Sequence, residues 1–597
     1  MAVLLITFTV MKIVFYVYNS PHSSFRIADI IAVIAHGLPQ DLSTVSYLAV
    51  LPWAVCVTTI WFQKKWLSAL LNIYYYIISP LLVLILIGDC VLYKFWQFKI
   101  DATIFNYLDS PKDIVVNVSG LFLAAATVAI IALSTGLIFA LRKTCKPVFN
   151  KCRKKSKVLC AFVLVGGCMF LMIRGGVGRS TMNVGYVYYS SDQFLNHSAV
   201  NPAFSLIYSS LKYKNLEKLY HFYSAKECEE NFETLQFSTL TTEPDTLLTT
   251  TRPNVVLILM EGLGATFVEP LGGEKGVTPN LNKLCGEGVL FSRCYANSYR
   301  TDRGTICTLS GYPAFPDLSV MKMPEKSMDL PSIARSLSKE GYATSYLYGG
   351  DKNFTNANSY LLSTGYDCVM GDEHFPSSVR HTHSWGVTDH IVIDTLYNQI
   401  CRQYSTGKPF FITCQTLASH EDWQVPYHRL DNKKTNAMAY LDNCIGNLVE
   451  KLRQHPVWDN LLVIFIPDHG ITYPENITEA DIKKCHIPLL WIGGTIKHAT
   501  EINKICNQTD LAATLLGQMD IDHRQFEFSR DVTSKTYTYP CAIHTFGRGV
   551  SFIDSSGVSV EDLTSRRLIT DMPSPNANRV KNAHTILQFT VKDLSEK

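Results

Sequence analysis

The stretch "NVVLILMEG", residues 254–262, decides the fold, because it places an unbroken apolar run directly before a carboxylate and a glycine. Short apolar runs without alternation are typical of parallel strands that are buried on both faces. In sheets built from such strands, ligands bind beyond the carboxyl ends of the strands. Glu261 stands at that end, so the stretch predicts a buried strand that delivers a carboxylate to the ligand-binding edge.

Outward from this stretch, further short apolar runs alternate with segments of helical periodicity. This alternation is the signature of an α/β domain with a doubly wound, largely parallel central sheet flanked by helices. We predict strands at 254–260, 289–296, 343–349, 409–416, 460–467 and 487–493, and helices at 278–287, 303–311, 329–340, 434–453 and 509–518. The predicted catalytic domain covers 253–545, and a C-terminal extension covers 546–597.

Polar side chains follow several of these strands, and all of them fall on one edge of the predicted sheet. Each has an ordinary explanation by itself, as a helix cap or a solvated histidine. Their shared edge favours a functional site. The residues are Glu261 after the first strand, Thr301 at the start of the helix after 289–296, Asp351 in "YGGDKN", His420 in "LASHED", and Asp468 with His469 in "IPDHG".

Two carboxylates and an imidazole suit one divalent cation, with Mn²⁺, Zn²⁺ and Mg²⁺ as the candidates. A threonine hydroxyl completes such a set, and a bound cation makes that hydroxyl easier to deprotonate. At the start of a helix, Thr301 would also face the anion that it attacks. Two interpretations of Thr301 therefore stay open, an ordinary N-cap and a nucleophile toward phosphorus.

The first 174 residues differ from the rest, since they hold five stretches that approach the length needed to span a bilayer. These are 1–19, which contains Lys12, and 44–62, 67–92, 116–141 and 158–174. Residues 26–37 are too short to span and are predicted to lie at the interface. The loop 142–157 holds eight Lys or Arg residues, which places it in the cytoplasm and everything after the fifth span outside.

Between the predicted anchor (1–174) and the catalytic domain lies a segment, 175–252, with two predicted parts. The spacing of apolar residues near 192–213 predicts an amphipathic helix on the membrane surface. The Thr- and Glu-rich stretch 228–252 predicts a linker. The net charge of +3 gives no basic stripe for nucleic acid. Eleven of the 17 cysteines follow residue 175, without zinc-type spacing.

Longer motifs carry a resemblance to a known family. The segments "NVVLILMEG", "GVTPNLNKLCGEGVLFSRCYANSYRTDRGTICTLSGYP", "YLYGGDKNFTNANSYLLSTGYD", "SWGVTDH", "PDHG", "HIPLLWIGG" and "QTDLAATLLG" resemble the lipoteichoic acid synthase-like phosphoglycerol transferases. That family belongs to the alkaline phosphatase and sulfatase superfamily. The similarity covers about 255–520 and, more loosely, the five-span anchor with "NHSAVNPAFSLIYSSL".

The resemblance implies roles for residues that match the family's motifs. It implies one Mn²⁺-like ion on Glu261, Thr301, Asp468 and His469, and a phosphate contact from His420. Substrate contacts are expected from Arg303, Asp351, Trp385 and His486. Two of these have an open alternative: Trp385 lines the pocket or simply packs, and His486 sits where two-metal relatives place a ligand or simply starts a strand. The chain departs from the family at Tyr348, Thr355 and Ala357, where some relatives carry His, Trp and Arg.

The resemblance therefore implies a multi-pass enzyme of the bacterial cytoplasmic membrane with its catalytic domain outside. It would move glycerol phosphate from a phospholipid such as phosphatidylglycerol to a glycan or glycolipid through a covalent phospho-Thr301 intermediate. Phosphoethanolamine transfer is the nearest alternative, with Asp351 or Glu421 as partners for the amine. A sulfatase is a second alternative, although "RTDRG" lacks the x-Pro-x-Arg that follows a sulfatase nucleophile.

Overall fold

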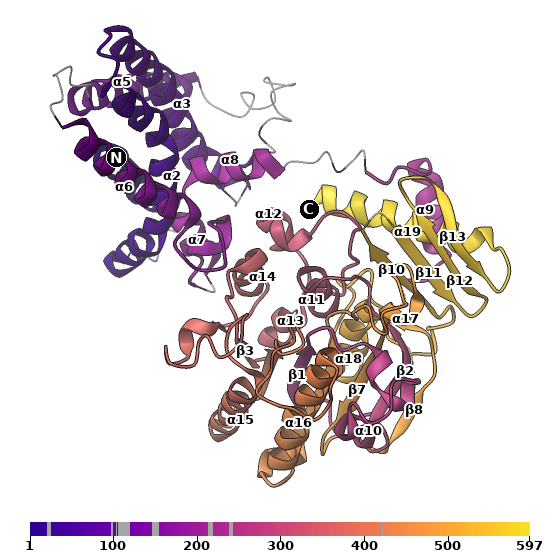
Figure 1. Ribbon diagram of the computed structural model, residues 1–597. Coiled ribbons are helices and arrows are strands. Elements are labelled where there is room, and N and C mark those ends of the chain that lie inside the picture. The colour runs from indigo at the N-terminus through magenta and orange to yellow at the C-terminus, as the bar shows by residue number, and fades with distance from the viewer. Residues whose placement is uncertain are drawn as a thin grey trace. The chain divides into compact units, whose positions relative to one another are not determined.

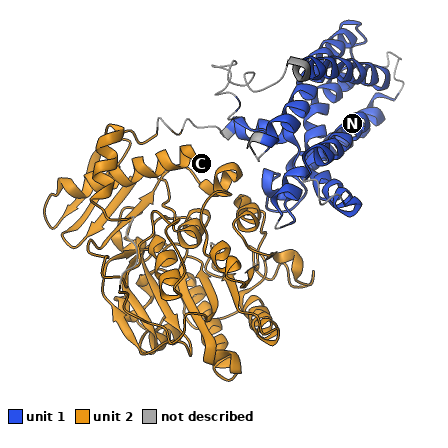
Figure 2. Cartoon of the chain, turned by 180° about the vertical axis from the view of Figure 1, so that it is seen from behind, with its two compact units in different colours: residues 1–214 blue, residues 215–597 orange. Residues whose placement is uncertain are grey.

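The computed structural model divides the chain into two compact units, residues 1–214 and 215–597 (Figure 2). It describes residues 1–20, 26–96, 99–102, 104, 120–145, 154–190, 192–212, 216, 219–237, 243–420, 422–547 and 549–597. Unit 1 is helical, and unit 2 contains the sheets (Figure 1).

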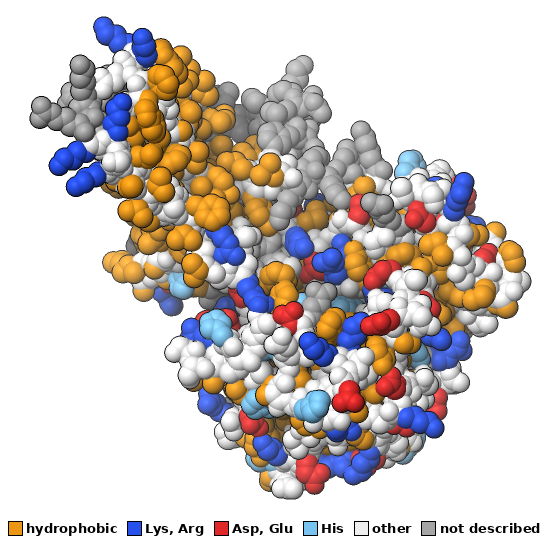
Figure 3. All heavy atoms as spheres, in the orientation of Figure 1, with side chains coloured by type: hydrophobic (Ala, Val, Ile, Leu, Met, Phe, Trp, Pro, Cys, Tyr) orange, Lys and Arg blue, Asp and Glu red, His pale blue; other side chains and the backbone are white. Residues whose placement is uncertain are grey.

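Within its described residues, unit 1 contains five helices that are long and apolar enough to cross a membrane, which confirms the predicted number. Hydrophobic side chains dominate its visible surface, whereas the surface of unit 2 is mixed with charges (Figure 3). A helix whose outward face is apolar is stable only where lipid or protein covers it. The helices are α1 (Ala2–Asn19), α2 (Ile27–Thr58), α3 (Trp66–Trp96), α5 (Gly120–Thr144) and α6 (Lys155–Arg174).

The second predicted span was wrong in its bounds. The predicted interfacial segment 26–37 and the span 44–62 form one helix, α2, which continues through Pro39 and Pro52. Gln40 and Asp41, which lie between these two segments, do not interrupt α2 because both side chains are buried and hydrogen-bonded within unit 1. Gln40 donates to the carbonyl of Asn183 at 3.1 Å, and the Asp41 carboxylate accepts from the Asn201 amide at 2.8 Å.

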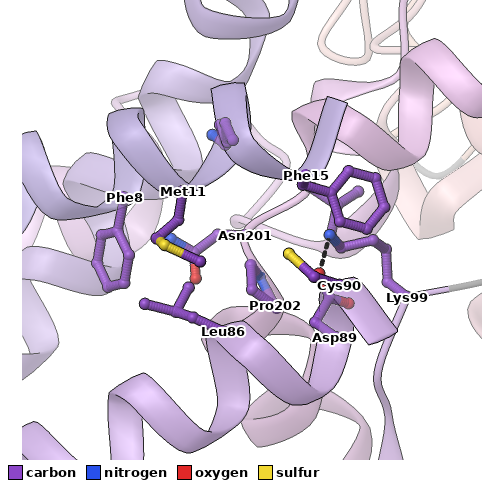
Figure 4. Close-up of a pocket in the computed structure, with 11 residues that line it drawn as sticks. Phe8, Met11, Phe15, Leu86, Asp89, Cys90, Lys99, Asn201 and Pro202 are labelled. Carbon is purple, nitrogen blue, oxygen red and sulfur yellow. Dashed lines mark hydrogen bonds and ion pairs between the residues drawn. The ribbon is translucent and has the colours of Figure 1, made fainter. Parts of the chain in front are cut away.

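Charges inside the apolar unit are paired. Lys12 donates to Asp41 at 2.8 Å, and both side chains are almost fully buried. Lys99 forms a second buried ion pair with Asp89, and Lys12, Asp89 and Lys99 line one small pocket, which Figure 4 shows with Asp89 and Lys99 labelled. Charged side chains in spanning helices are tolerated when they face the bundle interior and find a partner, so Lys12 is compatible with a membrane-spanning α1.

After the fifth long helix, the predicted helical spacing near 192–213 corresponds to α7 (Gln193–Ala199) and α8 (Pro202–Lys212). The prediction of a linker at 228–252 was wrong in part. Helix α9 (Ala225–Glu233) lies in unit 2, where Phe232 stacks on Phe589 with ring centroids 3.8 Å apart. Further along, Leu247 and Leu248 are buried, so apolar contacts fix much of this stretch to unit 2.

A nine-stranded mixed sheet forms the centre of unit 2, with the strand order β4-β3-β5-β1-β6-β7-β2-β8 and β9 beside β2. All six predicted strands are confirmed, and the short β4, β8 and β9 were not predicted. Strand β7 does not run parallel to its neighbours; it is antiparallel to both β6 and β2. The strands are β1 (Asn254–Met260), β2 (Val289–Tyr295), β3 (Ala343–Tyr348), β4 (Cys368–Met370), β5 (Phe410–Gln415), β6 (Leu461–Pro467), β7 (His486–Ile492), β8 (Thr500–Ile502) and β9 (Cys506–Asn507).

The central strands are fully buried, as their uninterrupted apolar sequence requires. Every residue of β1 and β6 is buried, and on one face of the sheet alternate side chains of both strands, such as Ile258 and Phe465, pack with flanking helices in one core. Helix α15 was not predicted, although its buried positions Val392, Ile393, Leu396 and Ile400 have helical spacing. The flanking helices are α10 (Pro279–Cys285), α11 (Thr301–Ser310), α13 (Ile333–Lys339), α15 (Asp389–Ser405), α16 (Lys433–Arg453) and α18 (Leu511–Gln518).

A second, antiparallel sheet of four strands completes unit 2 and carries helix α19 (Ala577–Glu596) (Figure 1). Strands β10 and β11 pair antiparallel from Cys541↔Asp554 to Phe546↔Gly549. The boundary predicted at 545/546 therefore falls inside one hairpin rather than between two domains. The strands are β10 (Cys541–Phe546), β11 (Gly549–Asp554), β12 (Gly557–Asp562) and β13 (Arg567–Met572).

Candidate active site

Thr301 is the first residue of α11, and Arg300 occupies the N-cap position without a side-chain cap. The Thr301 hydroxyl donates instead to the Glu261 carboxylate at 3.1 Å and lies 3.5 Å from Nε2 of His469. The N-cap interpretation of Thr301 is therefore wrong. Its hydroxyl points away from the helix backbone and toward the ends of β1 and β6.

A close backbone contact brings α11 to these strand ends. A Cβ atom at Gly304 would lie 2.0 Å from the carbonyl oxygen of Asp468, so only glycine lets the first turn of α11 pack directly on the residue after β6. The Gln508 amide donates to the same Asp468 carbonyl at 2.9 Å. These contacts hold Thr301 beside the residues that follow β1 and β6.

Glu261, Asp468 and His469 form a compact group in which one ligand atom of each lies within 4.8 Å of the others. It is the one such cluster of three metal-binding residues within the described part of the chain. Nε2 of His469 lies 3.4 Å from Oε1 of Glu261 and 3.6 Å from Oδ2 of Asp468. Glu261 and Asp468 are buried, and the side chain of His469 is 12% exposed.

The two oxygens of Asp468 have different surroundings. Oδ1 accepts from the backbone N–H groups of Gly262 at 2.9 Å and His469 at 2.8 Å, which fixes the carboxylate plane. Oδ2 is buried and has no hydrogen-bond partner among the described residues. A buried carboxylate oxygen without a hydrogen bond is costly unless a cation approaches it.

His469 is oriented as a metal ligand would be. Its Nδ1 lies 3.1 Å from the Gly470 carbonyl, and a donor at Nδ1 leaves the Nε2 lone pair facing Glu261 and Asp468. Burial alone lowers the pKa of His469, but Asp468 and Glu261 outweigh it and raise this pKa to about 9. Burial and the neighbouring Asp468 raise the pKa of Glu261 to about 7. The cluster therefore favours positive charge at its centre.

These observations fit one divalent cation. The donor set of two carboxylates, one imidazole and one hydroxyl suits Mn²⁺, Zn²⁺ or Mg²⁺, and the Oδ2 atom of Asp468 is left for such a ligand bond. Thr301 lies next to the same group through its bond to Glu261.

The cluster opens into a pocket of about 640 Å³. Thr301, Asp351, Trp385 and His420 all line it, together with Glu261 and His469. The ring of Trp385 lies 3.7 Å from the ring of His420, centroid to centroid. The structure thus brings three of the predicted substrate-contacting residues to the same cavity as the predicted nucleophile.

Asp389 positions the loop that carries His420. Its buried carboxylate accepts from the backbone N–H groups of Leu417 at 2.8 Å and Ala418 at 2.9 Å. Burial raises the pKa of Asp389 to about 6, although these two hydrogen bonds act in the opposite direction. Asp389 is therefore a structural support for the pocket rather than part of its lining.

Two other predicted contacts lie elsewhere. Arg303 donates to the carbonyl of Leu318 at 2.9 Å and lies over the ring of Tyr299, outside the pocket lining. His486 begins β7 and its Nε2 lies 2.9 Å from the Ser292 carbonyl, so it too is absent from the lining. Because β7 is antiparallel, its first residue reaches the edge where the other strands end, but its ring turns to β2.

Sequence reasoning missed several basic residues of the pocket. Lys484 is almost fully buried in its wall, where it pairs with the half-exposed Glu479. Lys434 lies at the start of α16, with its ammonium 5.1 Å from the ring centre of Trp423. Arg300, Lys322 and Lys352 also line the cavity. No local motif marks these residues, since they converge only when the sheet is assembled.

Comparison with known proteins agrees with this geometry. Residues 253–521 match the family described as Sulfatase. A phosphoglycerol transferase I of Xanthomonas euvesicatoria pv. vesicatoria (strain 85-10) is 26% identical over 308 residues, 48% of this chain and 43% of that protein. Phosphoglycerol transferase I of Escherichia coli (strain SMS-3-5 / SECEC) is 22% identical over 245 residues, 38% and 32% of the two chains. The chain therefore spans less than half the length of these curated relatives.

Two solved structures share the fold of unit 2. A protein in the alkaline phosphatase superfamily from Vibrio parahaemolyticus superposes with a TM-score of 0.55 and 25% identity, covering 64% of this chain and 98% of that one. The lipoteichoic acid synthase LtaP from Listeria monocytogenes gives a TM-score of 0.52 at 15% identity, covering 61% and 98%. Residues 253–521 of this chain thus resemble the Sulfatase family, and the curated relatives that match this chain are named phosphoglycerol transferase I.

Proposed function

We propose that the chain is a membrane-anchored, metal-dependent transferase that moves glycerol phosphate from a phospholipid to a hydroxyl group of a glycan or glycolipid. One observation carries the proposal. The Thr301 hydroxyl stands at the first turn of α11, bonded to Glu261 and beside His469, inside a cavity large enough for a phosphodiester headgroup. The relatives named phosphoglycerol transferase I support the choice of glycerol phosphate.

The transfer takes two steps at phosphorus. The oxygen of Thr301 attacks the donor phosphate and its hydroxyl gives up a proton, a Thr–O–P bond forms, and the P–O bond to diacylglycerol breaks; diacylglycerol leaves after taking up the equivalent of that proton. In the second step the acceptor hydroxyl attacks the same phosphorus, loses its proton and releases Thr301. The hydrogen bond from Thr301 to Glu261 points the oxygen lone pairs into the cavity before the first step.

The residues around Thr301 would bind the metal ion and the phosphate and stabilise the charge that develops on them. A divalent ion held by Glu261, Thr301, Asp468 and His469, Mn²⁺ in the first instance, would stabilise the deprotonated hydroxyl and the charge on the phosphate oxygens. His420 would contact or protonate a phosphate oxygen, and the N–H groups at the start of α11 face the same anion. The basic side chains of the lining, such as the buried Lys484, add positive potential for a phosphodiester.

The nearest alternative, phosphoethanolamine transfer, differs from this proposal in the headgroup of the donor lipid. A phosphoethanolamine donor would bring an ammonium group that needs a carboxylate partner. Asp351 lines the pocket, whereas Glu421 lies outside the described residues. A sulfatase reaction finds no support at the nucleophile, because Thr301 is followed by "DRG" and lacks the x-Pro-x-Arg pattern.

Because the curated relatives are named phosphoglycerol transferase I, we expect diacylglycerol to be released from phosphatidylglycerol and not from phosphatidylethanolamine. The measurement uses the purified full-length chain in nanodiscs of either lipid, with Mn²⁺ and mass-spectrometric quantification of diacylglycerol. Preferential release from phosphatidylethanolamine would replace the headgroup in the proposal. Release from neither lipid would contradict phospholipid-dependent transfer.

The second expectation concerns orientation. The basic loop 142–157, of which residues 146–153 lie outside the described part, favours a cytoplasmic N-terminus and an external unit 2. An alkaline phosphatase fused after residue 252 should then be active, and a cytoplasmic fluorescent reporter at the same point should be dark. The reverse pattern would place the pocket in the cytoplasm and contradict the proposed cell-envelope role.

A further inference from the structure

Two stretches of unit 1 carry basic side chains and no acidic ones. Residues 59–66 contain two Lys, residues 142–157 contain eight Lys or Arg, and neither stretch contains Asp or Glu. Seven of these side chains are described, and all seven are exposed. We call this set the basic end: Lys64, Lys65, Arg142, Lys143, Lys154, Lys155 and Lys157.

Contacts between helices bring the two stretches together. The Trp53 indole of α2 donates to the Phe162 carbonyl of α6 at 3.0 Å, and the Ser43 hydroxyl of α2 donates to the Ile173 carbonyl of α6 at 3.0 Å. Later positions of α2 thus meet earlier positions of α6, so the two helices are antiparallel. The last turn of α2 therefore lies beside the start of α6.

Helices α3 and α5 meet in the same way. Arg142, in the last turn of α5, donates to the Asn72 side chain at 3.1 Å and to the Tyr76 hydroxyl at 2.7 Å, both near the start of α3. Because residues 59–65 join α2 to α3, four helix ends share one end of the unit. Figure 3 shows Lys and Arg side chains gathered at the upper left of unit 1, with no Asp or Glu visible among them.

Exposed aromatic rings border these charges. Trp61, Phe62 and Trp66 have 50%, 59% and 57% of their surface exposed, and all three stand within three positions of Lys64. Trp rings are enriched at the headgroup level of a bilayer, because they join an apolar body to a polar N–H group. The rings therefore favour a position of the lysines at the depth of the lipid headgroups.

Charge and rings together restrict the partner. Ammonium and guanidinium groups bind phosphate oxygens, whereas exposed rings need an apolar neighbour. A soluble anion or a nucleic acid backbone would use the charges and leave the rings in water. A leaflet of anionic phospholipids offers phosphate and apolar chains at adjoining depths, and each juxtamembrane Lys or Arg strengthens such binding about fivefold, which corresponds to about 1 kcal/mol.

We propose that the basic end, with Trp61 and Trp66, is a docking surface that holds anionic phospholipid headgroups against unit 1. The phosphate groups lie among the exposed lysines, and the Trp rings contact the glycerol and acyl region beside them. The surface uses neither Thr301 nor the metal-binding cluster, and it does not depend on which side of the membrane this end faces. The inference is therefore independent of the proposed transfer reaction.

The test measures lipid binding to the full-length protein in mild detergent. The protein is titrated with phosphatidylserine or with phosphatidylcholine, and native mass spectrometry counts the bound lipids. Phosphatidylserine is anionic but is not the proposed donor, so turnover does not consume it. We expect saturable binding of phosphatidylserine, at least tenfold tighter than that of phosphatidylcholine and weaker at higher ionic strength.

Charge removal should act on the anionic lipid alone. Lys64→Gln/Lys65→Gln and Lys154→Gln/Lys155→Gln should each weaken phosphatidylserine binding at least tenfold and leave phosphatidylcholine binding unchanged. Both variants should melt as wild type does, because the side chains are exposed. The control Lys226→Gln/Lys283→Gln removes two exposed lysines from unit 2 and should bind phosphatidylserine as wild type does.

Several results would overturn the inference. Equal affinity for the two phospholipids would do so, as would wild-type affinity for phosphatidylserine in both loop variants. Displacement of phosphatidylserine by millimolar inorganic phosphate would make the surface a site for soluble anions, and tighter binding of an oligouridine RNA would make nucleic acid the partner. A protein that binds phosphatidylserine but releases no diacylglycerol from phosphatidylglycerol would refute the proposed function and leave the docking surface in place.

Discussion

We expect Thr301→Ala to abolish turnover and the proposed covalent intermediate together, lowering the rate of diacylglycerol release by roughly three orders of magnitude or more. The reason is that the Thr301 hydroxyl is bonded to Glu261 and lies 3.5 Å from Nε2 of His469, within the acidic cluster. Intact-protein mass spectrometry after incubation with phosphatidylglycerol should show a glycerol phosphate adduct on the wild type and none on Thr301→Ala. Thr301→Ser keeps a hydroxyl and should retain part of both signals.

The stability of the variants separates chemistry from folding. Loss of an N-cap costs about 1 kcal/mol and leaves catalysis nearly unchanged, but Thr301 makes no cap bond, so the melting temperature should shift little. Thr395→Ala provides a matched control, because Thr395 is a helical threonine on α15 whose hydroxyl bonds only to the Ile391 carbonyl. An adduct on Thr301→Ala, or diacylglycerol release at the wild-type rate, would exclude the mechanism.

Removal of the metal should have the second largest effect. Treatment with a chelator is expected to lower activity at least about 100-fold, since even changes in the outer shell of metal sites cost 10- to 100-fold. Mn²⁺ should restore it, and the order of recovery with Mn²⁺, Zn²⁺ and Mg²⁺ identifies the preferred ion. Asp468→Asn and His469→Ala should lose both Mn²⁺ binding and activity, while Asp394→Asn, an exposed carboxylate on α15, should lose neither.

Competition between protons and Mn²⁺ for the same side chains provides a second test of the metal site. In the ion-free protein the pKa of His469 is raised to about 9 and that of Glu261 to about 7, so both must lose protons before they bind a cation. Mn²⁺ affinity, measured by calorimetry, should therefore fall as the pH is lowered from 9 toward 6. Full activity in a protein shown by elemental analysis to be metal-free would contradict the metal site.

Much of the candidate site follows from sequence because of where strands end. Glu261, Asp468 and His469 each follow an apolar run directly, and parallel strands align their carboxyl ends at one edge. The pattern therefore predicted their neighbourhood without any knowledge of the strand order. The long apolar helices of unit 1 could also be predicted from continuous stretches of sequence, since length and composition suffice to recognise them.

The continuity of α2 and the short outer strands of the sheet could not be predicted from residues adjacent in the chain. Continuity of α2 depends on Asn183 and Asn201, which satisfy Gln40 and Asp41 from more than 140 positions along the chain. The short strands β4, β8 and β9 exist because longer neighbours supply their hydrogen bonds. Two to three residues carry too little periodicity to predict a strand.

The sequence alone determined the buried strands, the carboxylates after them and the threonine at the next helix, because each depends on residues adjacent in the chain. Tertiary structure decided the direction of β7, which turns His486 toward Ser292 instead of the pocket. It also decided that Gly304 packs on Asp468 and that Lys484 and Trp423 enter the cavity wall. These features depend on contacts between segments that are distant in the chain, and such contacts exist only after the hydrophobic core has fixed the order and direction of the strands.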